Sequence, residues 1–283
     1  MDFSPPSPRY QPERRLGEGG RGEVFRAYDH VLRRRVALKR FSVDGGSSPE
    51  EAWQEGIHLA AVQHPNVVGV YDFGTDEAGP FLVMELVEGE TLEEVVARGA
   101  FPLRDFRILA QQSLEGLAAA HQVGLLHRDL KPGNLMLKHG PTNDLQVKLM
   151  DFGIAGFTAA AFGDVLPAAS DKPGTILGTV EFMAPEQFEG LPVSARSELY
   201  SMGCIFYYAL TGRDPFLGES MEAIVASHLG AQVIPLADIR LDLPQAVCDW
   251  VMRLLRRRPE ERHGSVAEAL LTLHGLFADL AAP

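Results

Sequence analysis

Short apolar runs dominate the first third of the chain and predict a β-rich region. Between Glu13 and Phe41 apolar residues are interrupted by a cluster of glycines, and two further apolar runs occupy residues 67–73 and 81–86. Runs of this length, bounded by glycine and polar residues, are typical of strands joined by turns. Residues 1–12 are rich in Pro and Ser and are expected to form a flexible tail.

A single helix is predicted within this β-rich part. Ser48 has the features of an N-cap, Pro49 occupies the first helical position, and Glu51 completes a capping box. The helix is expected to run to about Gln63. Glu55 lies on its otherwise apolar face, and a carboxylate there is costly unless a cation pairs with it.

After Gly89 the pattern changes to long amphipathic helices. They are predicted at residues 92–98, 103–122, 196–211 and 246–255. The chain is therefore expected to be an α+β protein with two lobes. The predicted parts are the tail at 1–12, a small lobe at 13–87 with an antiparallel sheet and one helix, and a mainly helical lobe at 88–283.

Composition narrows the possible functions. The 283 residues contain 38 acidic and 26 basic side chains, a net charge of −12, which disfavours nucleic acid or an anionic membrane surface as a partner. No apolar run is long enough to span a bilayer. Cys204 and Cys248 lack metal-site spacing and are expected to be reduced thiols in a cytoplasmic protein.

A glycine-rich segment lies between the first two predicted strands. Gly17, Gly19 and Gly22 form a Gly-x-Gly-x-x-Gly pattern that leads into a strand, whereas the dinucleotide-binding version leads into a helix. Glycines allow backbone amides to approach phosphate oxygens closely. The pattern alone is equally compatible with an ordinary hairpin.

Lys39 ends an apolar run one loop after the glycines and could direct a cation toward the same phosphates. The alternative is a surface lysine with a buried aliphatic stem. Glu55 is the candidate anion that would hold Lys39 in place, although Glu50 and Glu51 are nearby competitors.

Three further motifs follow in a fixed order. Residues His127–Asn134 read His-Arg-Asp-Leu-Lys-Pro-Gly-Asn, then come Asp151-Phe152-Gly153 and the Met-Ala-Pro-Glu run at 183–186. Together with the glycine-rich loop and the run Val36–Lys39, this set resembles the signature of eukaryotic-type (Hanks-type) serine/threonine protein kinases, especially bacterial members. The resemblance covers roughly residues 13–275 and implies the bilobal protein kinase fold.

The resemblance implies ATP and Mg²⁺ as cofactors, with Mn²⁺ as a substitute, because Mg²⁺ prefers oxygen ligands. Asp129 would accept the proton of the substrate hydroxyl, and Lys131 would steady the transferred phosphate. Asn134 and Asp151 would hold the metal ion. Lys39, held by Glu55, would bind the α- and β-phosphates.

The resemblance also implies a nucleotide pocket. Its expected residues are Leu16, Gly17, Gly19, Gly22, Val24, Ala37, Lys39, Met84, Glu85, Val87, Asn134, Met136 and Asp151. Met84 occupies the gatekeeper position, and Glu85 and Val87 would hydrogen-bond adenine through their backbones. The apolar members are equally consistent with plain core.

Lys131-Pro132 and the Gly178-Thr179 pair resemble the serine/threonine pattern, so protein Ser and Thr hydroxyls are the expected acceptors, including those of the chain itself. Gly133 occupies a position that is acidic in some basophilic relatives, so a strict arginine requirement is not supported. Thr175 matches the usual phosphorylation position. Gly156 and Glu51 stand where relatives often have basic residues, so only Arg128 remains of the expected basic pocket. Phosphorylation of Thr175 is therefore expected to affect activity weakly, unless another contact orders the loop.

Two glutamates are expected to have structural roles in the helical lobe. Glu198 stands where the family has an aspartate that accepts backbone hydrogen bonds, and its extra methylene predicts local repacking with the hydrogen-bonding role retained. Glu186 is expected to pair with Arg262.

Two other functions are less consistent with these motifs. A pseudokinase would have lost Lys39, Asp129 or Asp151, and all three are present. A small-molecule kinase on a related fold is disfavoured by the long segment from Asp151 to Glu186. The sequence leaves the oligomeric state open.

Overall fold

The computed structural model describes residues 9–19, 22–41, 59–77, 79–139, 144–152 and 180–281. Contacts divide the chain into two compact units, one with Met1–Gln63 and Val68–Glu88 and the other with His64–Val67 and Gly89–Pro283.

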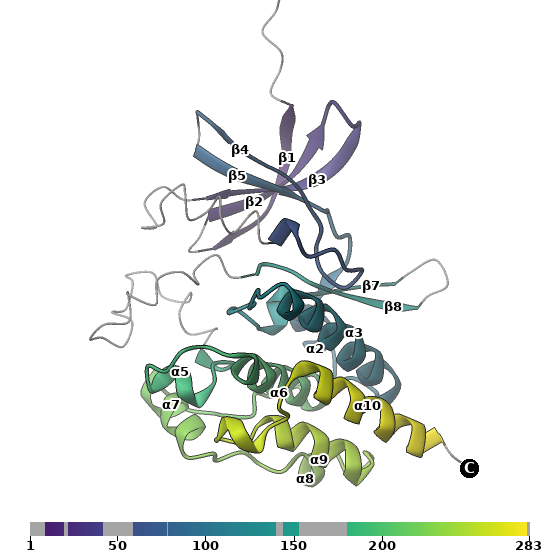
Figure 1. Ribbon diagram of the computed structural model, residues 1–283, viewed down its shortest axis with the longest axis vertical. Coiled ribbons are helices and arrows are strands. Elements are labelled where there is room, and N and C mark those ends of the chain that lie inside the picture. Colours follow the sequence, from purple (N-terminus) through teal and green to yellow (C-terminus); the bar gives the residue numbers. More distant parts are fainter. Residues whose placement is uncertain are drawn as a thin grey trace, which may run out of the picture. The chain divides into compact units, whose positions relative to one another are not determined.

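The first unit is built on an antiparallel sheet of five strands (Figure 1) in the order β1-β2-β3-β5-β4. The strands are β1 (Tyr10–Gly19), β2 (Gly22–Asp29), β3 (Arg34–Phe41), β4 (Val70–Asp76) and β5 (Gly79–Met84). All five lie in or overlap the apolar runs from which strands were predicted.

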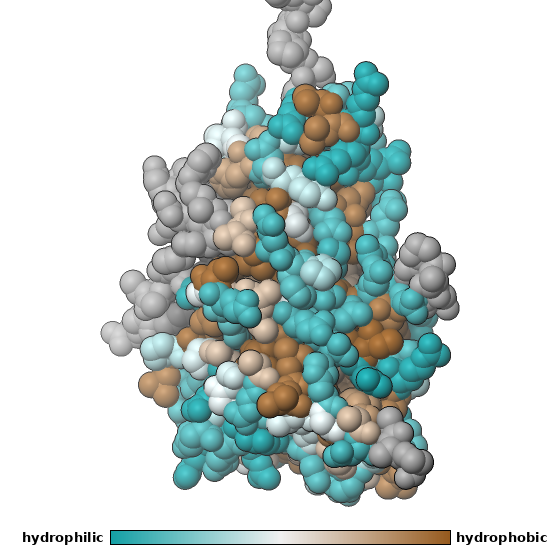
Figure 2. All heavy atoms as spheres, turned by 45° about the vertical axis from the view of Figure 1, so that its right-hand side comes forward, coloured by the Kyte–Doolittle hydropathy of each residue, from teal (hydrophilic) through white to brown (hydrophobic). Residues whose placement is uncertain are grey.

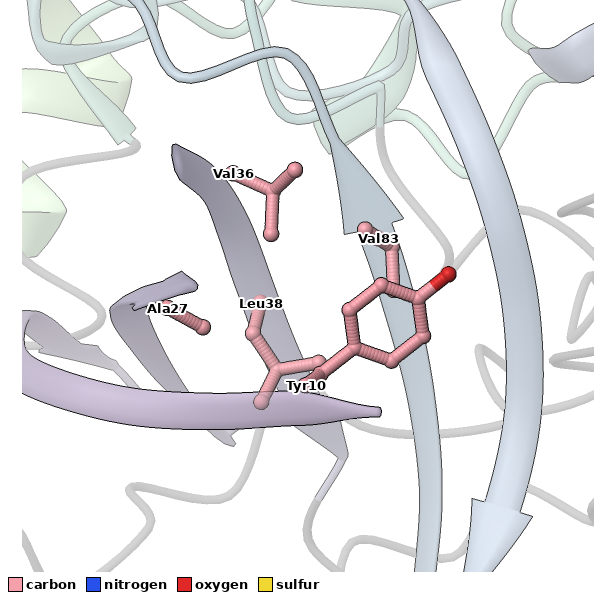
Figure 3. Close-up of a cluster of buried hydrophobic side chains, with 5 residues drawn as sticks. All are labelled: Tyr10, Ala27, Val36, Leu38 and Val83. Atoms are coloured by element: carbon pink, nitrogen blue, oxygen red, sulfur yellow. The ribbon is translucent and has the colours of Figure 1, made fainter. Parts of the chain in front are cut away.

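One side of this sheet carries a small apolar core. Figure 3 shows the five side chains of this cluster gathered together; they are Tyr10, Ala27, Val36, Leu38 and Val83. Tyr10 packs edge-on against Phe81 with ring centroids 5.9 Å apart, and its hydroxyl donates a hydrogen bond of 2.5 Å to Asp72. These contacts explain why β1 begins at Tyr10, ahead of the Glu13 expected from the sequence.

The second unit consists mainly of helices (Figure 1). They are α2 (Leu92–Val96), α3 (Leu103–Gln122), α5 (Pro185–Phe188), α6 (Ala195–Thr211), α7 (Met221–Leu229), α8 (Leu236–Ile239), α9 (Gln245–Leu254) and α10 (Val266–Ala281). A three-stranded sheet joins them, formed by β6 (Glu90–Thr91), β7 (Leu135–His139) and β8 (Leu145–Leu149) in that order. The four helices predicted in this region are present with ends that differ by no more than two residues.

Helix α6 forms the centre of the second unit. Ser194 caps its first turn, and Gly212 ends it with φ 70°, the left-handed conformation that glycine adopts without steric cost. Phe206 packs against Phe106 of α3 and Trp250 of α9. Most of its side chains are buried, so α6 is a core helix rather than the amphipathic helix that was predicted.

On the face drawn in Figure 2, hydrophilic residues separate the patches of hydrophobic ones. In the described parts of the chain, every helix falls short of the length and apolar character that a membrane crossing requires. Cys204 and Cys248 are both buried and free.

A buried ion pair ties the α5 segment to the end of the second unit. Arg262 donates hydrogen bonds of 2.8 and 2.9 Å to the two carboxylate oxygens of Glu186. The Arg262 side chain is 0% exposed and that of Glu186 is 6% exposed. Burial alone would raise the Glu186 pKa, but the hydrogen bonds and the charge of Arg262, together with weaker hydrogen bonds, lower it overall. The predicted pairing is confirmed.

Replacing Arg262 with Met is expected to lower the free energy of unfolding by about 3–5 kcal/mol, because it leaves a buried carboxylate without its cation. Urea denaturation measures this change. Arg98→Met is the matched control, because the pair that Arg98 forms with Glu90 is more than half exposed on both sides. If the two variants lost the same free energy of unfolding, burial of the Glu186–Arg262 pair would not be the cause of its effect on stability.

A buried histidine makes stability depend on pH. His228 is 0% exposed, and its Nδ1 forms a 2.8 Å hydrogen bond with the Tyr200 hydroxyl. Burial lowers its pKa to about 4, from about 6.5 in the unfolded chain. The folded state therefore takes up fewer protons than the unfolded state between these two values.

Stability from this group should be complete above about pH 6.5 and fall as the pH drops toward 4, by up to about 3 kcal/mol. Unfolding of wild type and His228→Gln at a series of pH values tests this, with the exposed His274→Gln as control. The wild-type curve should fall more steeply than that of His228→Gln. Parallel curves for those two proteins would refute the assignment.

Candidate active site

The glycine-rich segment is a hairpin in which β1 ends at Gly19 and β2 begins at Gly22. Gly22 has φ 134° and pairs with Phe41 of β3. A Cβ atom at Gly22 would overlap the carbonyl group of Arg40, whereas one at Gly17 would meet nothing within 4 Å. Gly22 is therefore required by the fold, but Gly17 is not.

Strand register places several predicted nucleotide-binding residues on one face of the first sheet. Val24 pairs with Lys39, and Ala37 pairs with Met84. Directly paired residues and alternate residues of one strand share a face, so these four side chains lie opposite the core face that carries Leu38. Lys39 is only 7% exposed, which rules out the surface lysine considered as its alternative.

The segment after β5 has one backbone group already in use. The amide of Glu85 donates a 2.8 Å hydrogen bond to the Gly69 carbonyl. The Glu85 amide is therefore used within the fold. Val87 follows two residues later, outside any helix or strand, and Leu16 in β1 is 43% exposed.

In the second unit, the predicted catalytic loop brings three polar side chains together. Asn134 Nδ2 donates to the Asp129 carbonyl oxygen at 2.7 Å and to Asp129 Oδ2 at 3.1 Å. Lys131 Nζ lies 3.2 Å from the same Oδ2 atom. Asp129 is 8% exposed. The loop thus holds a carboxylate in a defined direction, with a cation beside it.

His127 connects this loop to the segment that carries Asp151. Its Nε2 donates a 2.9 Å hydrogen bond to the Met150 carbonyl, and its ring packs on Phe152 with centroids 4.3 Å apart. Burial lowers the His127 pKa, and this favours the neutral form of the ring. The Met150 amide in turn donates to the Asn134 carbonyl at 2.9 Å, which fixes the two segments against each other.

Backbone strain marks both sides of this arrangement. Arg128 has φ 62° and Asp151 has φ 49°, a region that residues other than glycine adopt rarely and at a cost of about 1–3 kcal/mol. Arg128 directly precedes the predicted catalytic residue Asp129, and Asp151 is itself a predicted metal ligand. Such strain persists only where surrounding contacts impose it.

Glu198 provides one such contact. Its Oε1 accepts a 2.7 Å hydrogen bond from the Arg128 amide, so the predicted hydrogen-bonding role is retained. Its Oε2 lies 2.5 Å from His121 Nε2. A cavity of about 20 Å³ adjoins Glu198 and the catalytic loop, so the extra methylene has not overpacked the site.

The residues expected to hold the metal ion suit that role chemically. Because Asn134 Nδ2 donates to Asp129, its amide oxygen remains as the acceptor. That oxygen and the carboxylate of Asp151 are hard oxygen ligands of the kind Mg²⁺ prefers. Met136, the expected floor of the pocket, lies in β7 opposite Thr91.

Several sequence predictions fall outside the described residues. These include the capped helix with Glu55, the Asp-Phe-Gly glycine Gly153, and the loop positions Thr175, Gly178 and Thr179. The expected Glu55–Lys39 pair and the control by Thr175 therefore stay predictions.

Three acidic residues, one of them beside the catalytic loop, were not predicted from the sequence. Gly133 lacks a side chain, but a Cβ atom there would lie 3.4 Å from Glu93 Oε2. Burial raises the pKa values of Glu181 and Asp214, and the charge of Glu93 raises them further. Neither chain distance nor motif spacing links these three residues, so only the folded structure could identify them.

The sheet of the first unit, the helices of the second and the loop around Asp129 define the protein kinase fold. The chain belongs to the protein kinase domain family, which matches residues 10–273. Membership in this family implies the use of ATP and a divalent metal ion.

Bacterial kinases are among the curated relatives of this chain. The chain is 38% identical over 279 residues to serine/threonine-protein kinase pkn2 of Myxococcus xanthus, covering 95% of this chain and 33% of that protein. It is 37% identical over 271 residues to serine/threonine-protein kinase PknB of Mycobacterium tuberculosis, covering 93% and 42% respectively. The chain thus spans well under half the length of these relatives.

Solved structures show the same fold. Rad53 in complex with AMP-PNP matches with a TM-score of 0.76 at 27% identity, covering 93% of this chain and 64% of that one. A double mutant of the Mycobacterium tuberculosis PknI kinase domain matches with a TM-score of 0.70 at 23% identity, covering 95% and 96%.

Substituting the two glycines should separate their roles. Gly22→Ala is expected to destabilise the fold by about 1–3 kcal/mol, because its φ and the Arg40 carbonyl oppose a side chain. Gly17→Ala should change stability by no more than about 0.5 kcal/mol. Thermal unfolding followed by circular dichroism measures both. A loss at Gly17 as large as at Gly22 would contradict the geometry.

Proposed function

We propose that this chain is a serine/threonine protein kinase that transfers the ATP γ-phosphate to Ser and Thr hydroxyls, including its own. The observation that carries the proposal is the fixed Asp129 carboxylate, which Asn134 and Lys131 hold at 3.1 and 3.2 Å. Protein kinase family membership supports it.

Phosphoryl transfer requires positioning and charge neutralisation more than covalent chemistry by the protein. The acceptor oxygen attacks the γ-phosphorus, the bond to the β–γ bridging oxygen breaks, and ADP leaves. Asp129 orients the acceptor hydroxyl and takes up its proton. Lys131, whose Nζ lies beside the Asp129 carboxylate, stabilises the negative charge of the transferred phosphoryl group.

The proposed cofactors are ATP with Mg²⁺, for which Mn²⁺ can substitute. Asn134 and Asp151 would hold the metal ion, which neutralises phosphate charge when bound. Lys39 would bind the α- and β-phosphates with Glu55 as its partner. AMP-PNP in the related Rad53 structure is an ATP analogue, which supports a nucleotide site in this chain.

The remaining nucleotide contacts are assigned by position. Gly17, Gly19 and Gly22 would present backbone amides to the phosphates. Leu16, Val24, Ala37, Met84 and Met136 would surround adenine, which would hydrogen-bond the Glu85 carbonyl and the Val87 amide. Gly17 is the most informative of these, since its lack of a side chain serves no purpose in the fold.

Protein Ser and Thr acceptors, rather than Tyr, are proposed from the Lys131-Pro132 pair. The printed names of the curated relatives pkn2 and PknB also specify serine/threonine kinases. Bacterial signalling in the cytoplasm is the proposed setting.

Incubation with Mg-ATP and a generic protein such as casein tests the proposal, with mass spectrometry to locate phosphate on casein and on the chain. Wild type should label Ser and Thr, and Asp129→Asn should reduce kcat by at least a hundredfold, because it removes the proton acceptor. Asp279→Asn, an exposed change in α10, is the control and should behave as wild type.

Nucleotide binding is measured separately with a fluorescent ATP analogue. Gly17→Ala should weaken binding severalfold while the protein stays folded. If wild type binds Mg-ATP but labels nothing, the chain is a binding module, and transfer only to Tyr would refute the proposed acceptor.

A further inference from the structure

A groove on the second unit is lined by no residue of the catalytic loop His127–Asn134. Its volume is about 330 Å³, within the range of pockets that hold small ligands. Helix α3, which packs on β8 (Figure 1), forms one wall, and the segment before Val67 forms another. The described residues that these two walls contribute are Pro65, Asn66, Ile108, Gln111, Gln112 and Glu115. We call this site the α3 groove.

Hydrogen bonds hold two amide side chains of the α3 groove in place. Gln112 Oε1 accepts from Asn66 Nδ2 at 2.9 Å and from the Val147 amide at 2.8 Å. Asn66 Nδ2 also donates to the Val147 carbonyl at 2.8 Å, and Gln112 Nε2 donates to the Leu145 carbonyl at 3.2 Å. These bonds join α3, the segment before Val67 and β8. The walls are therefore fixed before any ligand arrives, which lowers the entropic cost of binding.

The polar groups of the α3 groove that remain for a ligand are mainly oxygen acceptors. Asn66 Nδ2 uses both of its hydrogens in the bonds above, so Asn66 has its Oδ1 atom to offer. Gln111 Nε2 donates to Glu115 Oε1 at 2.8 Å, which leaves Gln111 Oε1 as an acceptor. The carboxylate of Glu115 adds a negative charge to these oxygens. A ligand that donates hydrogen bonds and carries a positive charge suits such a surface.

Glu115 is the one charged residue among the described residues of the α3 groove. In the described part of the chain, its carboxylate receives the hydrogen bond from Gln111 and forms no ion pair. Ile108 precedes Glu115 by seven residues on α3, so the two side chains lie on the same face of that helix. The groove thus combines one anionic group with an apolar wall formed by Ile108 and Pro65.

We propose that the α3 groove binds a small organic cation, whose protonated amine pairs with Glu115 and whose alkyl part lies against Ile108 and Pro65. An ammonium group has three N–H donors and no acceptor, which matches the carboxylate and amide oxygens of the walls. The apolar contact adds the free energy of removing alkyl surface from water. This proposal is independent of the kinase function proposed above, because no catalytic or nucleotide-binding residue takes part.

Titration of the whole chain with pentylamine, followed by NMR, tests the proposal. Backbone signals of Asn66, Gln111 and Glu115 should shift along one saturation curve, with a Kd of about 1 mM or tighter. The neutral 1-pentanol has the same chain length and is the matched control ligand. It should bind at least about tenfold more weakly, because it cannot form the ion pair.

Variants locate the bound amine. Glu115→Gln removes the charge but keeps an oxygen that can accept from Gln111, and it should weaken pentylamine binding at least about tenfold. Ile108→Ala should weaken pentylamine about threefold and leave the affinity for methylamine, which lacks the alkyl chain, within about twofold. Glu219→Gln makes the same charge change at an exposed position outside the groove and should leave the pentylamine Kd within about twofold of wild type.

Three results would overturn the proposal. The first is the lack of a saturable shift at about 20 mM pentylamine. The second is equal loss of binding in Glu115→Gln and Glu219→Gln, which would mean that the amine responds only to the overall negative charge. The third is binding of 1-pentanol as tight as that of pentylamine. This last comparison uses the wild-type protein, so it decides the matter even if Glu115→Gln does not fold.

Discussion

The second unit depends on a guanidinium that has been taken entirely out of water. Arg262 donates to both oxygens of Glu186 and to the carbonyls of Arg196, Arg256 and Arg257. These bonds use all five of its N–H groups. Because the buried Arg262 side chain cannot replace any of these hydrogen bonds with bonds to water, the segments that supply the oxygens are held in one arrangement.

The site shows a related principle on a smaller scale. Strained backbone at Arg128 and Asp151 is opposed by hydrogen bonds from rigid elements, namely Glu198 on α6 and the His127–Met150 contact. Neither strained residue lies inside a helix or strand. Arg128 is held by a residue of α6, and Asp151 follows Met150, whose carbonyl accepts the hydrogen bond from His127. The energy stored in these conformations is offset by burial elsewhere in the unit.

The pattern of apolar residues predicted the strand-rich and helical regions, and the order of the motifs predicted the family and, through it, the Glu186–Arg262 pair. The ends of α3 were also predicted, since its apolar spacing stops at Gln122. Strands β7 and β8 were missed, although the sequence Leu-Gln-Val-Lys-Leu of β8 has the period-two alternation of a half-buried strand. The His121–Glu198 contact joins residues 77 apart in sequence, and no local pattern encodes it.

The helical half was harder to divide from sequence for a different reason. α6 is buried on nearly every side, so its apolar residues follow no single stripe. Short helices such as α8 depend on the packing of their neighbours. Tyr10 was assigned to the tail because its partners, Asp72 and Phe81, come more than sixty residues later.

The placement of β1 affects how this sheet can meet other chains. β1 is an outer strand whose residues from Gln11 to Glu18 are exposed, and its pairing with β2 shifts register twice. Charged side chains and such irregularities discourage intermolecular strand pairing. A proteolytic cut that released β1 would uncover β2, whose ladder to β3 is regular, and would leave a template for aggregation.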